Sequence, residues 1–211
     1  MGVKILDMGL GNISSVASWL SRSDIKYKLV GELCDVDTED TLVLCGVGNT
    51  VEYVTKLIDL GFQDHIVRRD YESRNRWYSG RAKIVGICSG FQALCQKIDE
   101  DGRQCAGLGL IPGYCHSIGA SKKFNNGWHP CSDISGIERI LGNESYPGFR
   151  HSLYFNHGGG IFVEKDTDNF FYLSGERYTV GYMSKNIVGV QFHPEKSGSL
   201  GDFICRRIFN V

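Results

Sequence analysis

The sequence predicts an α/β fold with an open, mostly parallel central sheet, helices on both faces and antiparallel additions in the C-terminal half. In the first half, short apolar runs alternate with amphipathic helical segments, which is the pattern of βαβ units. From residue 102 to residue 184, the pattern changes to glycines, aromatic residues and short strand-like runs. The chain has 211 residues and no linker-like stretch, so we expect a single domain over residues 1–211.

Hydrophobic periodicity and turn residues place the individual elements. In the first half we expect strands at 3–6, 27–30, 41–45 and 83–87, and helices over about 14–22, 51–60 and 90–97. In the second half we expect strands at 170–173, 178–183 and 187–192, and a closing helix over 200–209. The run 83–87 suits a strand that is covered on both faces of the sheet.

The composition excludes several classes of function. The net charge is −1 with no basic bias, which gives no electrostatic footprint for nucleic acid. No apolar run approaches about 18 residues, so we expect no membrane span, and the N-terminus lacks the features of a signal peptide. The eight cysteines form no CxxC pair and no Cys/His cluster with zinc spacing. We therefore expect reduced thiols in a cytoplasmic protein that needs neither a metal nor another cofactor.

One of these cysteines lies in a sequence typical of a nucleophile. Gly86-Ile87-Cys88-Ser89-Gly90 follows an apolar strand and precedes a predicted helix. The flanking glycines permit a sharp strand-to-helix turn that lifts the thiol above the sheet, as the nucleophile elbow does for serine. The N-terminus of the following helix would favour the thiolate, which is the reactive form of cysteine. Taken alone, the motif also fits a buried cysteine between two packing glycines.

A second motif, Gln191-Phe192-His193-Pro194-Glu195, follows the last predicted strand. Pro194 stiffens the turn, and the His-x-Glu spacing places a carboxylate close enough to orient the imidazole. A cysteine hydrolase needs such an imidazole to hold the thiolate and to protonate a leaving amine. Taken alone, this motif also fits a surface loop. Because Cys88 and His193 both follow predicted strands, we expect them to meet at the carboxyl edge of the sheet.

Together these motifs resemble those of the class I, or triad, glutamine amidotransferases, and in particular the glutaminase subunit of imidazole glycerol phosphate synthase from histidine biosynthesis. The resemblance covers nearly the whole chain, from 5–12 through 46–48, 86–92 and 127–128 to 189–198. It implies hydrolysis of L-glutamine to glutamate and ammonia through a thioester on Cys88. His193 would act as the base, and Glu195 would orient it.

The same resemblance implies further site residues and a partner. Backbone amides around Val47, Gly48 and Ser89 would form the oxyanion hole, and Gln92 would help to hold glutamine. A (β/α)8-barrel synthase subunit would bind as the partner in a heterodimer and receive the ammonia. The residues implied at that interface are Asn12, Trp128, Tyr154 and Lys196.

Three places depart from the family pattern. Cys45 stands where the family has proline, which restores a backbone N–H. His129 stands where the family has asparagine, and Gly158 and Gly159 replace two larger residues after His157. The glycines predict added conformational freedom in this loop. All three departures concern glutamine positioning or the partner-facing rim, and therefore the identity of the synthase.

Other interpretations remain open from the sequence. A paralogous glutaminase would supply ammonia to another synthase, such as one that amidates surface sugars. A non-catalytic partner-binding subunit would keep the fold without turnover. A cysteine peptidase or thioesterase would use a similar site. Gly46-Val47-Gly48 and Gln92 favour glutamine as the substrate over the peptides or thioesters of those enzymes.

Overall fold

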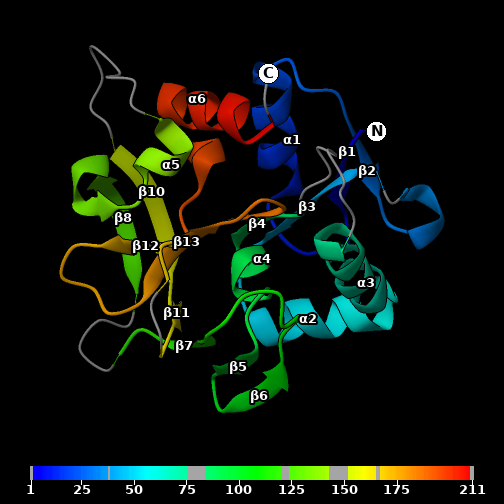
Figure 1. Cartoon of the computed structure of the whole chain (residues 1–211), viewed down its shortest axis with the longest axis horizontal. Helices are drawn as coiled ribbons and strands as arrows, with labels where there is room; N and C mark the ends of the chain where they lie inside the picture. The colour runs from blue at the N-terminus through cyan, green and yellow to red at the C-terminus, as the bar shows by residue number, and fades with distance from the viewer. Residues whose placement is uncertain are drawn as a thin grey trace.

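The structure is a computed structural model that describes residues 2–37, 39–75, 84–119, 124–142, 152–164 and 167–209. A large mixed sheet runs through the molecule, with helices on both of its faces (Figure 1). The strands are β1 (Val3–Leu6), β2 (Tyr27–Val30), β3 (Thr41–Gly46), β4 (Ile84–Cys88), β5 (Lys97–Glu100), β6 (Arg103–Ala106), β7 (Tyr114–Ser117), β8 (Asn125–Pro130), β9 (Ile134–Ser135), β10 (Ser152–His157), β11 (Gly159–Phe162), β12 (Phe170–Leu173), β13 (Thr179–Met183) and β14 (Ile187–Val190). The helices are α1 (Ile13–Arg22), α2 (Thr50–Asp59), α3 (Phe62–Asn75), α4 (Ser89–Gln92), α5 (Glu138–Leu141) and α6 (Gly198–Phe209), with short 3-10 turns η1 (Leu33–Asp35), η2 (Cys131–Asp133) and η3 (Pro194–Lys196).

The sheet divides into a parallel part and an antiparallel part. Strands β2, β1, β3, β4 and β14 lie side by side in that order, and every neighbouring pair among them is parallel. The order continues through β13, β11, β7, β5 and β6, where all pairs except β5 with β7 are antiparallel. Strands β8 and β10 form a separate antiparallel pair. The predicted mostly parallel sheet with antiparallel additions in the C-terminal half is confirmed.

Alternating side chains of the parallel strands supply two apolar cores. On β3, Val43 and Cys45 join the cluster that includes α1 and α6, whereas Leu42 and Leu44 join the cluster that includes α2 and α3. Strands buried on both faces are expected to be apolar at every position, and all six residues of β3 are buried. Helices therefore cover both faces, as the sequence predicts.

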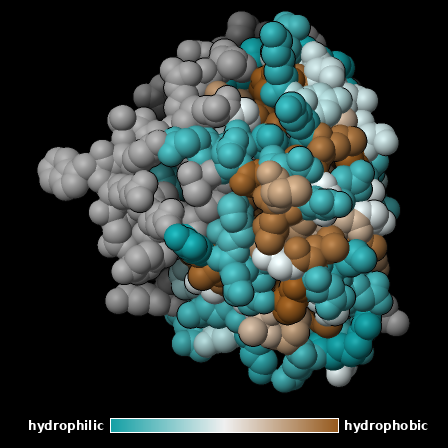
Figure 2. All heavy atoms as spheres, turned by 90° about the vertical axis from the view of Figure 1, so that its right-hand side faces the viewer, coloured by the Kyte–Doolittle hydropathy of each residue, from teal (hydrophilic) through white to brown (hydrophobic). Residues whose placement is uncertain are grey.

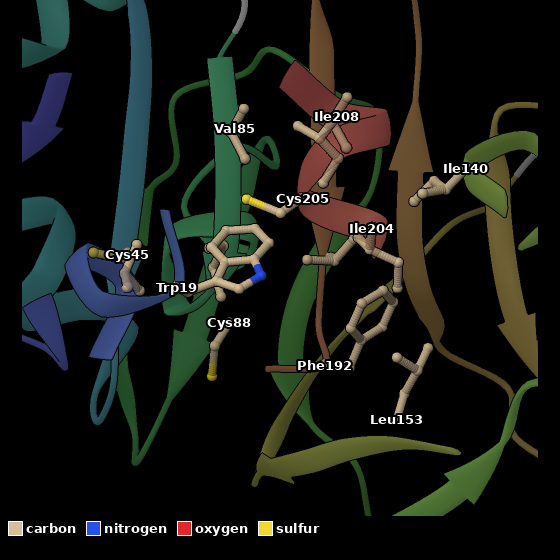
Figure 3. Packing of buried hydrophobic residues seen from close by; sticks show 14 of the residues in the cluster. Trp19, Cys45, Val85, Cys88, Ile140, Leu153, Phe192, Ile204, Cys205 and Ile208 are labelled. Atoms are coloured by element: carbon tan, nitrogen blue, oxygen red, sulfur yellow. The ribbon is translucent and has the colours of Figure 1, made fainter. Parts of the chain in front are cut away.

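Trp19 fixes the contact between α1 and α6. Its side chain is fully buried, and its Nε1 donates a hydrogen bond to the carbonyl oxygen of Gly201 at 2.8 Å. Figure 3 shows the indole among Val85, Cys88 and Cys205, with the sulfur of Cys88 turned away from it. Helices α1 and α6 therefore form one packed layer against the sheet.

The opposite layer is formed by α2 and α3. Figure 2 shows the side of the molecule that carries α3 and β2, where apolar side chains are interspersed with polar ones. Large apolar residues left exposed on these elements are Leu29, Ile58 and Val67. Within the described ranges, no helix is long and apolar enough to cross a membrane.

The helix expected over 90–97 is wrong in length. Helix α4 ends at Gln92, and Lys97 already begins β5. The carbonyls of Ala93, Cys95 and Gln96 instead accept hydrogen bonds from a returning segment, at the backbone N–H groups of 107–109. Helix α3 and the strands β5 to β11 were not predicted as individual elements. Lys83, the first residue of one expected strand, lies outside the described residues.

We predict that Gly90→Ala destabilises the protein. A Cβ at this position would overlap the carbonyl oxygen of Leu44 on β3, so α4 and β3 would have to separate. The expected loss in the free energy of unfolding is about 2–3 kcal/mol, as for other overpacked sites. Urea-induced unfolding measures it, with Gly31→Ala as the control, because a Cβ there meets only an ordinary contact of 3.4 Å with Asp7. Equal stability of the two variants would contradict this account of the packing.

Candidate active site

Cys88 lies at the junction of β4 and α4 with an unusual backbone conformation. Its φ of 54° and ψ of −114° belong to a region that residues with a side chain rarely adopt. Glycine is required on both sides of it. A Cβ on Gly90 would overlap the carbonyl of Leu44, and a Cβ on Gly86 would lie 2.9 Å from the carbonyl oxygen of Gly90. The structure therefore shows the sharp strand-to-helix turn that the Gly-x-Cys-x-Gly sequence predicts.

His193 and Glu195 form a buried pair just after β14. Nδ1 of His193 lies 2.7 Å from Oε1 of Glu195, and both side chains are shielded from solvent. Pro194 begins the 3-10 turn η3, which brings the carboxylate back against the imidazole. A carboxylate on Nδ1 holds the ring in the tautomer whose Nε2 is available for reaction.

The charge state of His193 depends on its two neighbours. Burial lowers its pKa, but hydrogen bonding and the negative charges of Cys88 and Glu195 raise it, to about 9 overall. Nε2 has no well-aligned hydrogen bond among the described residues, although the sulfur of Cys88 is close enough to shift the pKa. Catalytic contacts of this kind are commonly loose before substrate binds. His193 and Glu195 can therefore hold a charged imidazole beside Cys88.

Two further groups touch the sulfur of Cys88. The backbone carbonyl oxygen of Asn156 lies 3.9 Å from Sγ, and Nε2 of Gln191 lies 3.7 Å from it. The position of Gln191 follows from the sheet, because Ile87 on β4 is paired in register with Val190 on β14. Cys88, the last residue of β4, and Gln191, the first residue after β14, are therefore at the same level of the carboxyl edge.

The predicted oxyanion segment lies against this turn. Val47 and Gly48 line the same pocket as Cys88, and Val47 is 43% exposed. Gly48 has a φ of 99°, which glycine adopts without strain. Its carbonyl accepts a hydrogen bond of 2.9 Å from the Ser89 hydroxyl, so a side-chain contact ties this segment to the residue after Cys88. Asn49, the next residue, caps α2 by accepting from the N–H of Glu52.

A cavity of about 440 Å³ opens in front of Cys88. The sequence predicted five of its lining residues, namely Val47, Gly48, Cys88, Ser89 and Gln92. It did not predict the two acidic ones, Glu100 and Asp101, because they fall at the end of β5, where a helix had been expected nearby. Burial raises the pKa of Glu100, and one of its oxygens accepts from the backbone N–H of Thr50. No local sequence signal marks these carboxylates, since only the fold brings them to the pocket.

Three of the four predicted interface residues form a row of contacts. The rings of Trp128 and Tyr154 meet edge to face at 5.4 Å, and Nζ of Lys196 lies 5.5 Å from the centre of the Tyr154 ring. Trp128 is 57% exposed. The carbonyl oxygen of Tyr154 also accepts from the backbone N–H of His193 at 2.7 Å. Asn12 lies on the same edge of the sheet, in the loop that follows β1.

The departure at His129 belongs to a hydrogen-bond network that also includes His157, the residue before the altered glycines. Nε2 of His129 lies 2.8 Å from Oδ1 of Asn125, whose Nδ2 lies 3.3 Å from Nε2 of His157 and donates to the Tyr178 hydroxyl. Nδ1 of His157 in turn lies 2.7 Å from the carbonyl oxygen of Gly159. His129 therefore takes part in a chain of hydrogen bonds that runs from the rim strand β8 to the pocket.

The glycines after His157 are more constrained than the sequence suggested. The Gly158 carbonyl accepts from the N–H of Ile118, and the Gly159 carbonyl accepts from Gln92. A Cβ on Gly160 would lie 2.8 Å from the Tyr178 ring. Close packing, as well as backbone freedom, accounts for glycine here. The third departure, Cys45, is buried, and burial, together with the charge of nearby Glu195, raises its pKa to about 12.

Known proteins are similar to this chain in sequence. The family model of class-I glutamine amidotransferases matches residues 5–209. The imidazole glycerol phosphate synthase subunit HisH of Bacillus cereus (strain AH187) is 31% identical over 206 residues, which covers 94% of this chain and 90% of that protein. The HisH subunit of Carboxydothermus hydrogenoformans is 29% identical over 211 residues, which covers 97% and 96%.

Solved structures agree with the fold. A glutamine amidotransferase crystal structure superposes with a TM-score of 0.66 at 14% identity, covering 100% of both chains. A chain of PurLQS from Thermotoga maritima gives a TM-score of 0.65 at 18% identity, covering 99% of this chain and 97% of that one. The chain belongs to the class-I glutamine amidotransferase family, the enzymes that hydrolyse glutamine.

Proposed function

We propose that this chain is a glutaminase subunit in which Cys88 is the nucleophile, His193 the base and Glu195 the group that orients it. The observation that carries the proposal is the 2.7 Å contact between His193 and Glu195 beside a cysteine held at a sharp strand-to-helix turn. A nucleophile, a base and an orienting carboxylate in that order are the groups a covalent hydrolase needs. The intact set argues against a non-catalytic partner-binding subunit.

The reaction follows from these positions. The Cys88 thiolate attacks the side-chain carbonyl carbon of glutamine, and the negative charge passes to the carbonyl oxygen, where backbone amides around Val47, Gly48 and Ser89 would bind it. The C–N bond then breaks as protonated His193 gives its proton to the leaving nitrogen, which releases ammonia and leaves a thioester. Neutral His193 next takes a proton from water, and the hydroxide attacks the thioester. Glutamate leaves, and Cys88 is regenerated.

The pocket suits the amino-acid part of glutamine. Glu100 and Asp101 place two carboxyl groups in the lining of the pocket that also contains Cys88 and Gln92. We assign Glu100 to the α-ammonium group of glutamine. A bound cation would offset the burial that raises the pKa of this carboxylate.

We assign the ammonia to a (β/α)8-barrel synthase subunit, with imidazole glycerol phosphate synthase of histidine biosynthesis as the complex. Relatives named as its HisH subunit match at about 30% identity over most of the chain, which supports this assignment. The exposed row of Trp128, Tyr154 and Lys196 beside His193 would form the docking surface of the heterodimer. All eight cysteines are free, which suits the reducing cytoplasm.

One observation keeps a paralogous glutaminase as a second candidate. His129 and the glycines after His157, which depart from the family pattern, lie in the network that joins the rim strand β8 to the pocket. Changes at the partner-facing surface around His129 are consistent with a different partner, such as a synthase that amidates a surface sugar.

The first prediction tests the nucleophile. Cys88→Ala should lower glutamine hydrolysis by at least about 10³-fold while the fold is kept, because no other group can form the thioester. A chloroketone analogue of glutamine should label Cys88 and leave the exposed Cys34 unmodified, as peptide mass spectrometry would show. Wild-type turnover by Cys88→Ala would refute the assignment.

A second prediction concerns pH. The pKa of His193 in the folded chain is about 9, above the ordinary 6.5, so folding favours its charged form. The contribution of this pKa shift to the free energy of unfolding is fully present below pH 6.5 and is lost as the pH rises through about 9. It amounts to as much as about 3 kcal/mol. Urea unfolding of wild type and His193→Gln at pH 6 and pH 9.5 measures it, and a stability difference that does not shrink at pH 9.5 would contradict the raised pKa.

The synthase is identified by complementation. The gene is placed in a strain that lacks only the histidine-pathway glutaminase, first with the resident synthase and then with the barrel subunit from its own genome. We expect growth without histidine when the native barrel partner is supplied, because the altered rim is matched to that surface. Cys88→Ala in the same strain is the control. Growth in neither case, with glutaminase activity retained in vitro, would favour the paralogous pathway.

A further inference from the structure

Gln191 is a fully buried polar residue between the sheet and the catalytic histidine. It directly follows β14, and Phe192 and His193 come next. Gln191 contacts the sulfur of Cys88, and His193 lies close enough to the same sulfur for its pKa to respond to it. The side chain of Phe192, between them, packs in the core beside Phe155. Gln191 and His193 are therefore both delivered to Cys88 by the same segment.

A chain of side-chain hydrogen bonds links Gln191 to the rest of the pocket. Its Oε1 accepts from Nε2 of Gln92 at 3.0 Å. Nε2 of Gln92 also donates to the carbonyl oxygen of Gly159 at 2.8 Å, and its Oε1 accepts from the Thr50 hydroxyl. The other end of Gln191, its Nε2, lies 3.7 Å from the sulfur of Cys88.

The polarity of this chain is fixed by one carbonyl group. The carbonyl oxygen of Gly159 can only accept, so the amide nitrogen of Gln92, and not its oxygen, must face it. The same nitrogen faces Gln191, which must then present its oxygen to Gln92. The nitrogen of Gln191 is left to face the sulfur of Cys88. The assignment of both amides thus follows from hydrogen-bonding capacity and does not depend on telling nitrogen from oxygen.

We infer that Gln191 is a positioning residue for the nucleophile, which donates an N–H to Sγ of Cys88 and so favours the thiolate. This inference rests on the proposed function, in which Cys88 attacks glutamine. A thiolate accepts hydrogen bonds more strongly than a thiol does, so an N–H aimed at the sulfur stabilises the charged form. The donor counteracts the carbonyl of Asn156, 3.9 Å away, which can accept from a thiol but repels a thiolate.

The positioning role of Gln191 also gives Gln92 a function, which is to orient the Gln191 amide. Both N–H groups of its amide are occupied, one by Gly159 and one by Gln191. Only its oxygen retains acceptor capacity beyond the Thr50 hydroxyl. Gln92 therefore holds Gln191 in the orientation that directs the donor at Cys88, in addition to any contact it makes with glutamine.

Two substitutions of Gln191 separate the donor from the space that the side chain fills. Gln191→Glu keeps the shape and still accepts from Gln92, but it presents an oxygen to the sulfur. Gln191→Met keeps the length and removes both hydrogen bonds without adding charge. The matched controls are Gln104→Glu and Gln104→Met, because Gln104 is exposed on β6, where it bonds Asp99.

The measurement is the pH dependence of Cys88 alkylation by iodoacetamide, followed by mass spectrometry of the Cys88 peptide between pH 5 and pH 10. We expect the midpoint to rise by about one unit or more in Gln191→Glu and by a smaller amount in Gln191→Met, because both lose the donor to the thiolate. For glutamine hydrolysis we expect kcat to fall about tenfold or more with little change in KM, since the donor acts on the nucleophile and not on substrate binding. The Gln104 variants should match wild type in both measurements.

Each contrary result has a defined meaning. Unchanged midpoints in both Gln191 variants, even with lower stability or slower turnover, would overturn the inference and leave Gln191 a structural residue. A midpoint that rises in Gln191→Glu but not in Gln191→Met would overturn it as well. Repulsion between the new carboxylate and the thiolate would then account for the rise without a lost donor. Failure of the proposed function is distinguishable, because Cys88→Ala would still hydrolyse glutamine whatever the alkylation midpoints.

Discussion

The candidate site depends on how closely the backbone of α4 approaches β3. Gly90 has no room for a side chain against the carbonyl of Leu44, and the chain can enter α4 only by turning sharply at Cys88. That turn lifts the sulfur out of the strand and sets Ser89 against the carbonyl of Gly48. Cys88 and the Gly46–Gly48 segment are thus placed by one backbone contact. A conformation that is costly for cysteine persists because packing on both sides holds it.

The order of the parallel strands brings the remaining site residues together. Strand β4 lies between β3 and β14, so the segments that follow all three leave the same edge of the sheet. The Gly46–Gly48 segment follows from β3, Cys88 from β4, and Gln191 and His193 from β14. Residues from widely separated parts of the sequence therefore meet without any long loop having to be ordered. This is the usual location of functional groups in open α/β sheets.

Much of this arrangement could be predicted from local sequence, and the exceptions have physical causes. Strands β2 and β12 lie within the expected residues, because apolar runs bounded by turn residues define them. The helix after Cys88 was overestimated because the pattern shows helical residues but not the returning segment, whose N–H groups bond the carbonyls that would otherwise continue the helix. Helix α3 was missed because it is rich in charge and places few apolar residues, such as Phe62 and Ile66, in the core.

The same distinction holds for the site. Cys88, His193 and Glu195 are recognisable because the proposed chemistry requires those residue types within short, characteristic motifs. Glu100 and Gln191 carry no such spacing with Cys88, since their relation to it arises only when β5 and β14 take their places. The conformational freedom expected of Gly158 and Gly159 was likewise judged without their hydrogen-bonding partners, Ile118 and Gln92.

Strand β10 has a consequence for how such a protein can diverge. Tyr154, on the aromatic rim, and Asn156, whose carbonyl touches the sulfur of Cys88, are two residues apart on this one strand, and the backbone of Tyr154 also bonds that of His193. A β-strand transmits a displacement along its length far better than a loop does. Mutations that change the surface at Tyr154 are therefore expected to shift the Asn156 carbonyl and His193 relative to Cys88 as well. Under the proposed function, a change of partner at this surface therefore also changes the geometry around Cys88, so the two should evolve together and be engineered together.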